Sequence, residues 1–191
     1  MTTNLLSLSG RARVGKGTFV TLLRDILHPQ IVSEKAFATE LKAQIDPFLR
    51  SEYGISAFTT DTEEKKIIRP HLVALGAGMR AQDPGYWIKL VEPQVKLDLA
   101  RGDVVVVSDS RYRNECDWVH SLGGQVIYIE RLQPDGKPVP PANEEEAAND
   151  DAARAVSDFT ISWPTFEANY LYHMRPFVLD VWTQMIRQPT L

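Results

Sequence analysis

An apolar run near the start of the chain leads into a glycine-rich segment that ends in Gly-Lys. Leu5–Ser9 is followed by Gly10 and then by Gly15-Lys16-Gly17-Thr18, where an amphipathic pattern begins. This order predicts a strand, a loop and a helix. The two flanking glycines can adopt backbone angles that other residues resist, so the amides between them can turn inward around an anion. Because the helix N-terminus and the Lys16 ammonium place positive charge at the same point, the stretch predicts a phosphate-binding loop.

The glycine-rich segment matches the nucleotide-phosphate pattern GxxxxGK[ST] at every position except the last. Gly17 stands there, and Thr18 follows it. The Gly-Lys-Gly-Thr variant is typical of many small nucleotide kinases, and it leaves open whether Thr18 binds Mg²⁺ directly or through water. The alternative is an ordinary glycine-rich turn beside a surface lysine. The residues predicted to hold the phosphates of a nucleotide are Gly10, Arg13, Val14, Gly15, Lys16, Gly17 and Thr18.

Size and charge limit the function classes that are open to the chain. The 191 residues suffice for a full-sized core, and we expect a single domain over residues 1–191. A net charge of −4 gives no general attraction to nucleic acid, so we expect no nucleic-acid partner. The one cysteine, Cys116, excludes an internal disulfide, fits a reducing cytosol and is expected half-buried on a helix. We expect neither a signal peptide nor a membrane span, and therefore a cytoplasmic protein without a membrane partner.

Four consecutive valines precede a second polar motif. Val104–Val107 shows no alternation of polar and apolar residues, which indicates a strand buried on both faces, as in a parallel sheet between helices. Such strands end at the binding edge of an α/β sheet, so we expect Asp109 to point at a crevice there. An acid at this place can hold Mg²⁺ or orient a nucleophile, and Arg111 can bind a phosphate. The alternative for Asp109 is an acidic cap of the next helix, which is compatible with either role.

Hydrophobic periodicity and turn residues predict five strands that alternate with helices. We expect the strands at 5–9, 31–33, 104–107, 125–130 and 158–162, with Trp163-Pro164 breaking the last one. We expect helices at 16–27, 83–101 and 165–188, and a further helix around 116–122. Another helix should begin within 34–42 and end at 49, and a loop should follow at 51–61. The next helix should begin at 62 and be broken by glycine near Gly76 and Gly78. This alternation predicts the α/β class, with a five-stranded parallel sheet flanked by helices. The apolar last helix is compatible with a core role or with a homodimer interface.

The composition shifts after the strand expected at 125–130. Arg131 follows that strand, where an arginine could neutralise charge on a transferring phosphoryl group. Residues 132–151 are rich in proline and then in acids, which predicts a mobile loop with a short helix. We expect a short lid at about 132–155, and we interpret its acidic run, Glu144–Asp151, as a solvated face.

Basic and aromatic residues between the second and third strands are candidates for binding a substrate. Arg69 and Arg80 lie on or just after one helix, and two arginines there could bind a phosphate through bidentate hydrogen bonds. Lys42 lies on the preceding helix, and its alternative role is that of a solvated surface lysine. Trp87 is either a core residue or a platform on which a base stacks.

Taken in order along the chain, these landmarks resemble the phage-type deoxynucleoside monophosphate kinase family. The resemblance covers most of the chain between residues 5 and 162, and the phosphate loop is its one motif that is specific alone. The matching pieces are Ser9–Lys16, Phe37–Lys42, 69–76, Tyr86–Leu90, Ser108–Arg111 and Gly123–Ile127.

The resemblance implies a P-loop kinase fold and transfer of the γ-phosphate of ATP, with Mg²⁺, to a deoxynucleoside 5′-monophosphate. A helical region at about 35–102 would bind the monophosphate, and the protein would act in the host cytoplasm if it is phage-encoded. The catalytic residues would be Lys16, Asp109, Arg111 and Arg131, with Thr18 and Asp109 at the Mg²⁺. The positions around the monophosphate would be Lys42, Arg69, Trp87, Asp109, Arg111 and Glu115, to which we add Arg80 from its place near the glycines.

Two segments depart from the family's pattern. The lid lacks the arginine pairs that are common in related kinases, so charge stabilisation must come from elsewhere or be weaker. The segment Ser162–Thr165 replaces a polar, glycine-containing turn, although Trp163 could stack on the donor base there. Two alternatives stay open: another small-molecule P-loop kinase, of the dephospho-CoA or sugar-acid type, and a nucleotide-binding regulator without catalytic activity.

Overall fold

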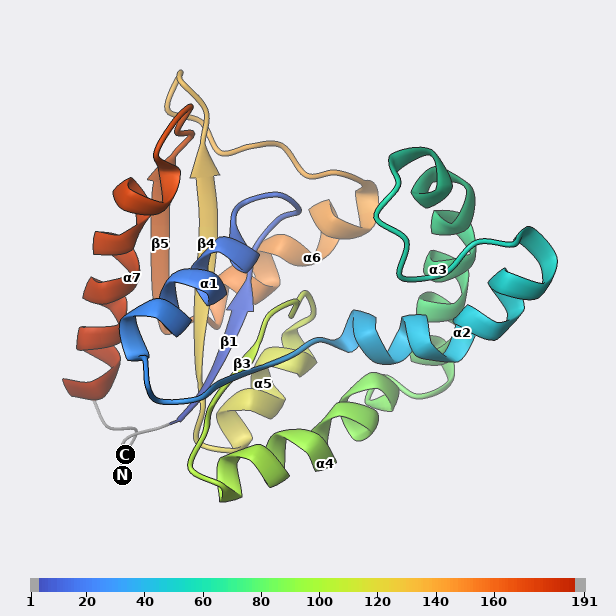
Figure 1. Cartoon of the computed structure of the whole chain (residues 1–191), viewed down its shortest axis with the longest axis horizontal. Helices are drawn as coiled ribbons and strands as arrows, with labels where there is room; N and C mark the ends of the chain where they lie inside the picture. The colour runs from blue at the N-terminus through green and yellow to red at the C-terminus, as the bar shows by residue number, and fades with distance from the viewer. Residues whose placement is uncertain (1–3, 188–191) are drawn as a thin grey trace. The chain divides into compact units, whose positions relative to one another are not determined.

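A single parallel sheet organises the computed structural model, which describes residues 4–187 (Figure 1). Within these residues the sheet has five strands in the order β2-β3-β1-β4-β5. All neighbouring strands run parallel, with Leu6 of β1 opposite Val106 of β3 and Gln125 of β4. The predicted α/β class with a five-stranded parallel sheet is therefore confirmed. The strands are β1 Leu5–Ser9, β2 Val32–Lys35, β3 Val104–Val107, β4 Gln125–Leu132 and β5 Phe159–Pro164.

Helices follow or connect the strands, as the sequence predicts. Pro70, Pro93 and Pro176 lie inside helices. The helices are α1 Lys16–Leu27, α2 Phe37–Tyr53, α3 Thr62–Gln82, α4 Tyr86–Ala100, α5 Arg113–Ser121, α6 Glu144–Ala155 and α7 Tyr170–Arg187.

Both faces of the sheet are buried, which explains why β3 is a run of valines. Helices α1 and α7 lie on one face of the sheet (Figure 1). Alternate strand residues such as Leu6 and Val106 belong to one apolar cluster with residues of these two helices. On the other face α5 packs against β1 and β4, and α6 packs against α5. Since successive side chains of a strand point to opposite faces, all four valines of β3 are buried. The buried residues of α7 include Val178 and Val181, so this helix has the core role; a homodimer interface stays a prediction.

The fifth strand differs from its prediction at its carboxyl end. Trp163 and Pro164 belong to β5 and pair with β4, where we expected them to break the strand. Proline is tolerated there because β5 is an edge strand. Pro164 is also the last residue of the strand, so the lack of an N–H there removes no hydrogen bond from the middle of the sheet. β4 also continues beyond Glu130, so Arg131 lies inside a strand and not after it.

The last helix begins later than predicted. Thr165 is not helical, because its backbone N–H and its hydroxyl both donate to the carbonyl of Leu132, at 2.9 and 3.0 Å. Helix α7 starts at Tyr170, and the predicted end at Gln188 lies outside the described residues. Cys116 lies on α5 as predicted but is fully buried, and this burial raises the pKa of its thiol to about 12.

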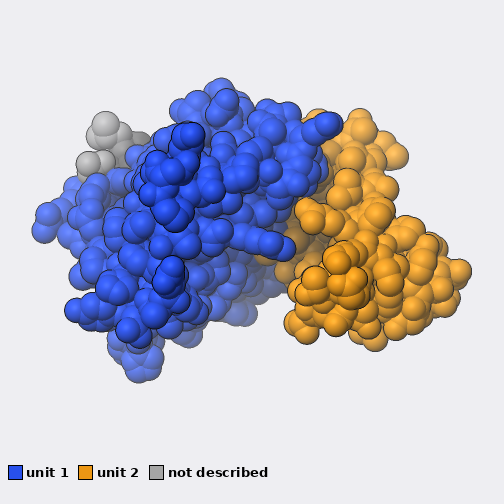
Figure 2. Space-filling view, turned by 90° about the horizontal axis from the view of Figure 1, so that it is seen from above, with its two compact units in different colours: residues 1–35, 94–191 blue, residues 36–93 orange. Residues whose placement is uncertain are grey.

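The chain divides into two compact units, residues 1–35 with 94–191 and residues 36–93 (Figure 2). The second unit contains α2, α3 and the start of α4, and its core cluster consists of Leu49, Ile55, Ala57 and Ile68. Helix α2 extends three residues into the loop predicted at 51–61, and Gly54 ends it in a left-handed conformation, φ 66°. Helix α3 continues through Gly76 and Gly78, which were expected to break it.

The second unit lies within the helical region predicted at about 35–102, and α6 lies within the lid predicted at about 132–155. The functional names given to these two regions, monophosphate-binding region and lid, stay predictions.

Replacing Gly124 with alanine should destabilise the first unit. A Cβ at this position would lie 2.6 Å from Val119 Cγ1 and 2.8 Å from Leu5 Cγ. We expect Gly124→Ala to lower the free energy of unfolding by about 1–3 kcal/mol, because both neighbours belong to a packed core. Urea unfolding followed by circular dichroism measures this change. The control is Gly78→Ala on α3, where a Cβ meets nothing within 4 Å and should stabilise by about 0.5–1 kcal/mol; equal unfolding midpoints for the two variants would contradict the expectation.

Candidate active site

The loop that joins β1 to α1 turns on two glycines with positive φ. Gly10 has φ 121° and Gly15 has φ 104°. A Cβ on Gly10 would lie 2.1 Å from the carbonyl oxygen of Ile129, so only glycine lets the chain leave β1 this close to β4. The carbonyl of Gly15 accepts from the N–H of Phe19 at 2.9 Å, which starts α1. The loop thus has the strand, glycine turn and helix order that the sequence predicts.

Trp163 of β5 supports the loop from the core side. Its side chain is completely buried, and its indole N–H donates to the carbonyl of Val14 at 2.7 Å. A Cβ on Gly15 would lie 2.8 Å from the same ring. This burial favours a core role for the Trp163 ring, with its N–H fixing the loop, whereas stacking of Trp163 on a donor base stays a prediction.

Lys16, the first residue of α1, reaches back over the loop. Its Nζ donates to the carbonyl oxygens of Gly10 at 2.5 Å and Arg11 at 2.9 Å. Burial, and next the positive charge of Arg111, lowers the pKa of Lys16 from 10.5 to about 8. The ammonium is thus held in a partly desolvated place where an additional anion would stabilise its charge.

A cleft of about 490 Å³ brings the two predicted polar motifs together. Lys16 and Arg111 both line it, although they follow different strands, since β1 and β3 are neighbours in the sheet. With Arg13, three cationic residues and the N-terminus of α1 therefore line one space of a size suited to phosphate groups. The lining consists of Ala12, Arg13, Gly15, Lys16, Gly17, Thr18, Ser108 and Arg111.

The segment after β3 is held by a buried carboxylate. Glu115 Oε2 accepts from the backbone N–H groups of Arg111 at 2.7 Å and Tyr112 at 3.1 Å, and Glu115 itself is buried on α5. Glu115 therefore orients the backbone that carries Arg111, whereas direct contact of Glu115 with a substrate stays a prediction. Asp109 is half-buried two residues after β3, at the carboxyl edge of the sheet.

A second cavity, of about 280 Å³, adjoins the loop on the side of β5 and α7. It shares Arg13, Gly15 and Thr18 with the cleft, so the two spaces meet along the start of α1. Arg131 lines it, and among the described side chains its Nε is a buried nitrogen without a hydrogen-bond partner. A buried N–H donor without a partner lowers the stability of the fold unless a ligand or a water molecule accepts its hydrogen bond. The rest of the lining is Val14, Trp163, Pro164, Thr165, Phe166, Tyr170 and Met174.

Four of the predicted substrate residues belong to the second unit. Trp87 is buried, and its indole N–H donates to the carbonyl of Gly76 at 3.3 Å, which favours the core role over base stacking. The Nζ of Lys42 lies 5.7 Å from the centre of the Phe58 ring. Arg69 is exposed on α3, and Arg80 is half-buried next to Gly76. Their part in binding a substrate stays a prediction.

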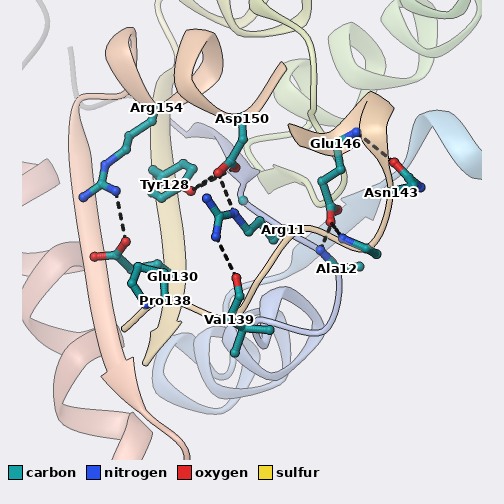
Figure 3. Close-up of polar contacts among 12 residues, drawn as sticks. Arg11, Ala12, Tyr128, Glu130, Pro138, Val139, Asn143, Glu146, Asp150 and Arg154 are labelled. Carbon is teal, nitrogen blue, oxygen red and sulfur yellow. Dashed lines mark hydrogen bonds and ion pairs between the residues drawn. The ribbon is translucent and has the colours of Figure 1, made fainter. Parts of the chain in front are cut away.

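The acids of α6 are the functional candidates that the sequence missed. Glu146 and Asp150 are 6% and 7% exposed, so the interpretation of this acidic run as a solvated face is wrong for them. Glu146 accepts from the N–H of Ala12, and Asp150 accepts from the side chain of Arg11 (Figure 3). Their spacing of four residues, which puts both on one face of a helix, is the signal that could have identified them.

Within residues 4–187, no group of three or more His, Cys, Asp or Glu side chains could hold a metal ion by itself. In the same part of the chain, none of the helices has the length and apolar character that crossing a bilayer requires.

Comparison with known proteins points to kinases. The family model described as phosphomevalonate kinase matches residues 8–125, more than half of the 191-residue chain. No curated protein matches the sequence. The solved dephospho-CoA kinase from Campylobacter jejuni is 13% identical, with a TM-score of 0.51 over 96% of this chain and 98% of that one. A shikimate kinase from Acinetobacter baumannii, solved in complex with shikimate, is 14% identical, with a TM-score of 0.45 over 94% of this chain and 93% of that one.

At these identities the likeness to solved structures concerns the fold alone. The likeness to the dephospho-CoA kinase, together with the parallel sheet, confirms the predicted P-loop kinase fold.

The amine of Lys16 should titrate near pH 8, and Arg111→Ala should raise this midpoint. Arg111 is the largest electrostatic cause that lowers the pKa of Lys16, so its removal relieves charge repulsion. The measurement is an NMR titration of ¹³C-labelled lysine, with Lys16→Arg used to assign the signal. The control is Arg113→Ala, whose guanidinium is 64% exposed and pairs with Asp117 at 3.5 Å. A wild-type midpoint near 10.5 would contradict the burial of this amine.

Proposed function

The chain belongs to the phosphomevalonate kinase family, and from that premise we propose that it transfers the γ-phosphate of ATP to a small molecule that already carries a phosphate group. The P-loop kinase fold and the family support a phosphotransferase. The acceptor predicted from the sequence is a deoxynucleoside 5′-monophosphate, and the product would be a diphosphate.

The observation that carries this proposal is the cleft that Lys16 and Arg111 line together with the glycine loop. Phosphoryl transfer requires alignment and charge neutralisation more than a strong base. The loop amides and Lys16 would hold the phosphates of ATP, and Arg111 would neutralise charge on the group in transfer. A nucleotide that brings negative charge would also favour the protonated form of Lys16, whose pKa burial has lowered to about 8.

The second cavity fits the rest of the donor nucleotide. It continues from the phosphate cleft along Gly15 and Thr18, so a ligand could occupy both spaces. Phe166 and Tyr170 line it and offer aromatic surface beside a purine, with the Phe166 ring stacked on His173 at 5.1 Å between centres. The unpartnered Nε of Arg131 is available to the ribose or the phosphates of the donor.

The donor set fits Mg²⁺, whose usual ligands in kinases are one or two protein oxygens, waters and substrate phosphates. The Thr18 hydroxyl would hold the ion in the cleft, with the Asp109 carboxylate at the sheet edge acting on it directly or through water. The bound ion would supply positive charge to the phosphate oxygens. The three-ligand cluster that residues 4–187 lack is not required for such a site.

Two acceptors share the chemistry that the site would recognise. A deoxynucleoside monophosphate and phosphomevalonate are both phosphate monoesters, so either would present a dianion to arginine and lysine. The sequence motifs around Lys42, Arg69 and Arg80 favour the nucleotide, whereas the match of the family model favours phosphomevalonate as the second candidate. The basic residues of the second unit would hold the acceptor phosphate in both cases.

An ADP-release assay with ATP and Mg²⁺ tests the proposal. The acceptor panel contains the four deoxynucleoside monophosphates, phosphomevalonate, dephospho-CoA and shikimate. We expect ADP release with at least one phosphate monoester, and we expect Lys16→Ala and Arg111→Ala to lower turnover at least about 100-fold, because each removes charge stabilisation from the transition state.

Arg113→Ala and Lys96→Ala are the matched controls, since each removes one positive charge outside the two cavities and should keep the wild-type rate. ADP release with dephospho-CoA or shikimate alone would assign a different small-molecule kinase. Tight ATP binding without turnover on any acceptor would instead support the nucleotide-binding regulator.

A further inference from the structure

We propose that Glu146 and Asp150 of α6 are positioning residues that hold the first half of the phosphate loop, and through it Lys16, in the arrangement that receives a nucleotide. This inference rests on the proposed kinase function for the identity of the ligand. We call the two carboxylates, with their loop partners Ala12 and Arg11, the α6 clasp (Figure 3).

Glu146 fastens the loop backbone to the start of α6. Its Oε1 accepts from the N–H of Ala12 and its Oε2 accepts from the N–H of Ala142, both at 2.7 Å. The N–H of Glu146 in turn donates to Asn143 Oδ1 at 2.8 Å, which caps the helix. A carboxylate this deeply buried is stable only when its oxygens have donors, so releasing Ala12 would be costly.

Asp150, one helical turn later, fastens a loop side chain. Its Oδ2 accepts from Arg11 Nε at 2.7 Å, and Arg11 also donates to the carbonyl of Val139 at 2.7 Å. The Tyr128 hydroxyl lies 2.9 Å from both oxygens of Asp150. Burial, and next this hydrogen bond, raises the pKa of Tyr128, so the phenol stays protonated and donates. Residues four apart share one face of a helix, so both carboxylates of the clasp meet consecutive loop residues.

The clasp acts on Lys16 through one peptide unit. The peptide group between Arg11 and Ala12 carries the carbonyl oxygen that accepts from Lys16 Nζ and the N–H that donates to Glu146. Because a peptide group is planar, rotating it to release one hydrogen bond also breaks the other. Glu146 therefore fixes the direction of a carbonyl that holds the Lys16 ammonium.

The two carboxylates of the clasp lie beside the cleft and not in its lining. Glu146 and Asp150 line another, small cavity together with Ser9, Gly10 and Arg111, and of these only Arg111 also lines the cleft. The residues that line the phosphate cleft come instead from the loop, the start of α1 and the segment after β3. This separation assigns to the two acids a role in orienting the loop, while the loop and Lys16 contact the phosphates.

Hydrogen exchange in the nucleotide-free protein tests the clasp directly. We expect the amide of Ala12 to exchange about tenfold or more faster in Glu146→Ala than in wild type, because its charge-assisted hydrogen bond is lost. The matched control is Glu144→Ala, which removes an exposed carboxylate from the same helical turn and should leave the exchange unchanged. Equal exchange in the two variants would overturn the proposal.

The titration of Lys16 gives a readout that general loss of stability would not move. Lys16 is faced by Arg111, which lowers its pKa, and by Glu146, Asp109 and Asp150, which raise it. We therefore expect Glu146→Gln and Asp150→Asn each to lower the Lys16 pKa below about 8, whereas Asp151→Asn, on an exposed neighbour, should not. Glu146→Gln keeps the side-chain volume and one acceptor oxygen, so it keeps the test usable if Glu146→Ala fails to fold.

ATP affinity then connects the clasp to function. Wild type and Asp151→Asn should bind ATP equally, and Glu146→Gln should bind it about tenfold more weakly, with the loss increasing as the pH approaches 8. Wild-type affinity in Glu146→Gln, with an unchanged Lys16 titration, would overturn the clasp while leaving the kinase proposal intact. Absence of ATP binding by wild type would overturn the kinase proposal, and the exchange and titration results would still decide the clasp.

Discussion

A loop that binds phosphate through its backbone belongs to neither a helix nor a strand, so other elements must supply the contacts that fix its shape. Each neighbouring layer supplies one here. β4 excludes a side chain at Gly10, β5 holds the carbonyl of Val14 through Trp163, and α6 holds Ala12 through Glu146. The position of Lys16 depends on these contacts, because its ammonium is bound by carbonyl oxygens of the same loop.

The segment predicted as a lid brings negative charge to the site, where an arginine-rich lid would bring positive charge. Helix α6 brings buried carboxylates next to Arg11 and Lys16, and each carboxylate has donors for its oxygens. Buried charges are tolerated when they are paired in this way. Positive charge for the transferred phosphoryl group would then come from three residues of the first unit. Lys16 and Arg111 line the phosphate cleft, and Arg131 lines the cavity beside it.

The fold could be predicted from sequence wherever one local pattern determined the structure. The valines of β3 and the glycines around Lys16 are such patterns. An unbroken run of valines is compatible with few structures besides a strand buried on both faces, and glycines at this spacing are compatible with few besides a phosphate loop. The burial of the α6 acids could not be predicted from the sequence, because Glu146 is paired with Ala12, which is 134 residues away in the chain. The same holds for Trp163: the dipeptide Trp-Pro is typical of a break, and only its place on an edge strand and its bond to Val14 make it part of the sheet. Roles of Lys42, Arg69 and Arg80 depend on a ligand, so they stay predictions.

The division into two compact units has an evolutionary consequence. Trp163 and Met174 belong to the main apolar core and also line the cavity proposed for the donor base, so substitutions that alter donor preference would also cost stability. Four of the seven predicted acceptor residues lie on helices with a small core of their own, around Leu49 and Ile68. If these four residues bind the acceptor as predicted, substitutions among them could change acceptor preference without disturbing the main core that lines the donor cavity.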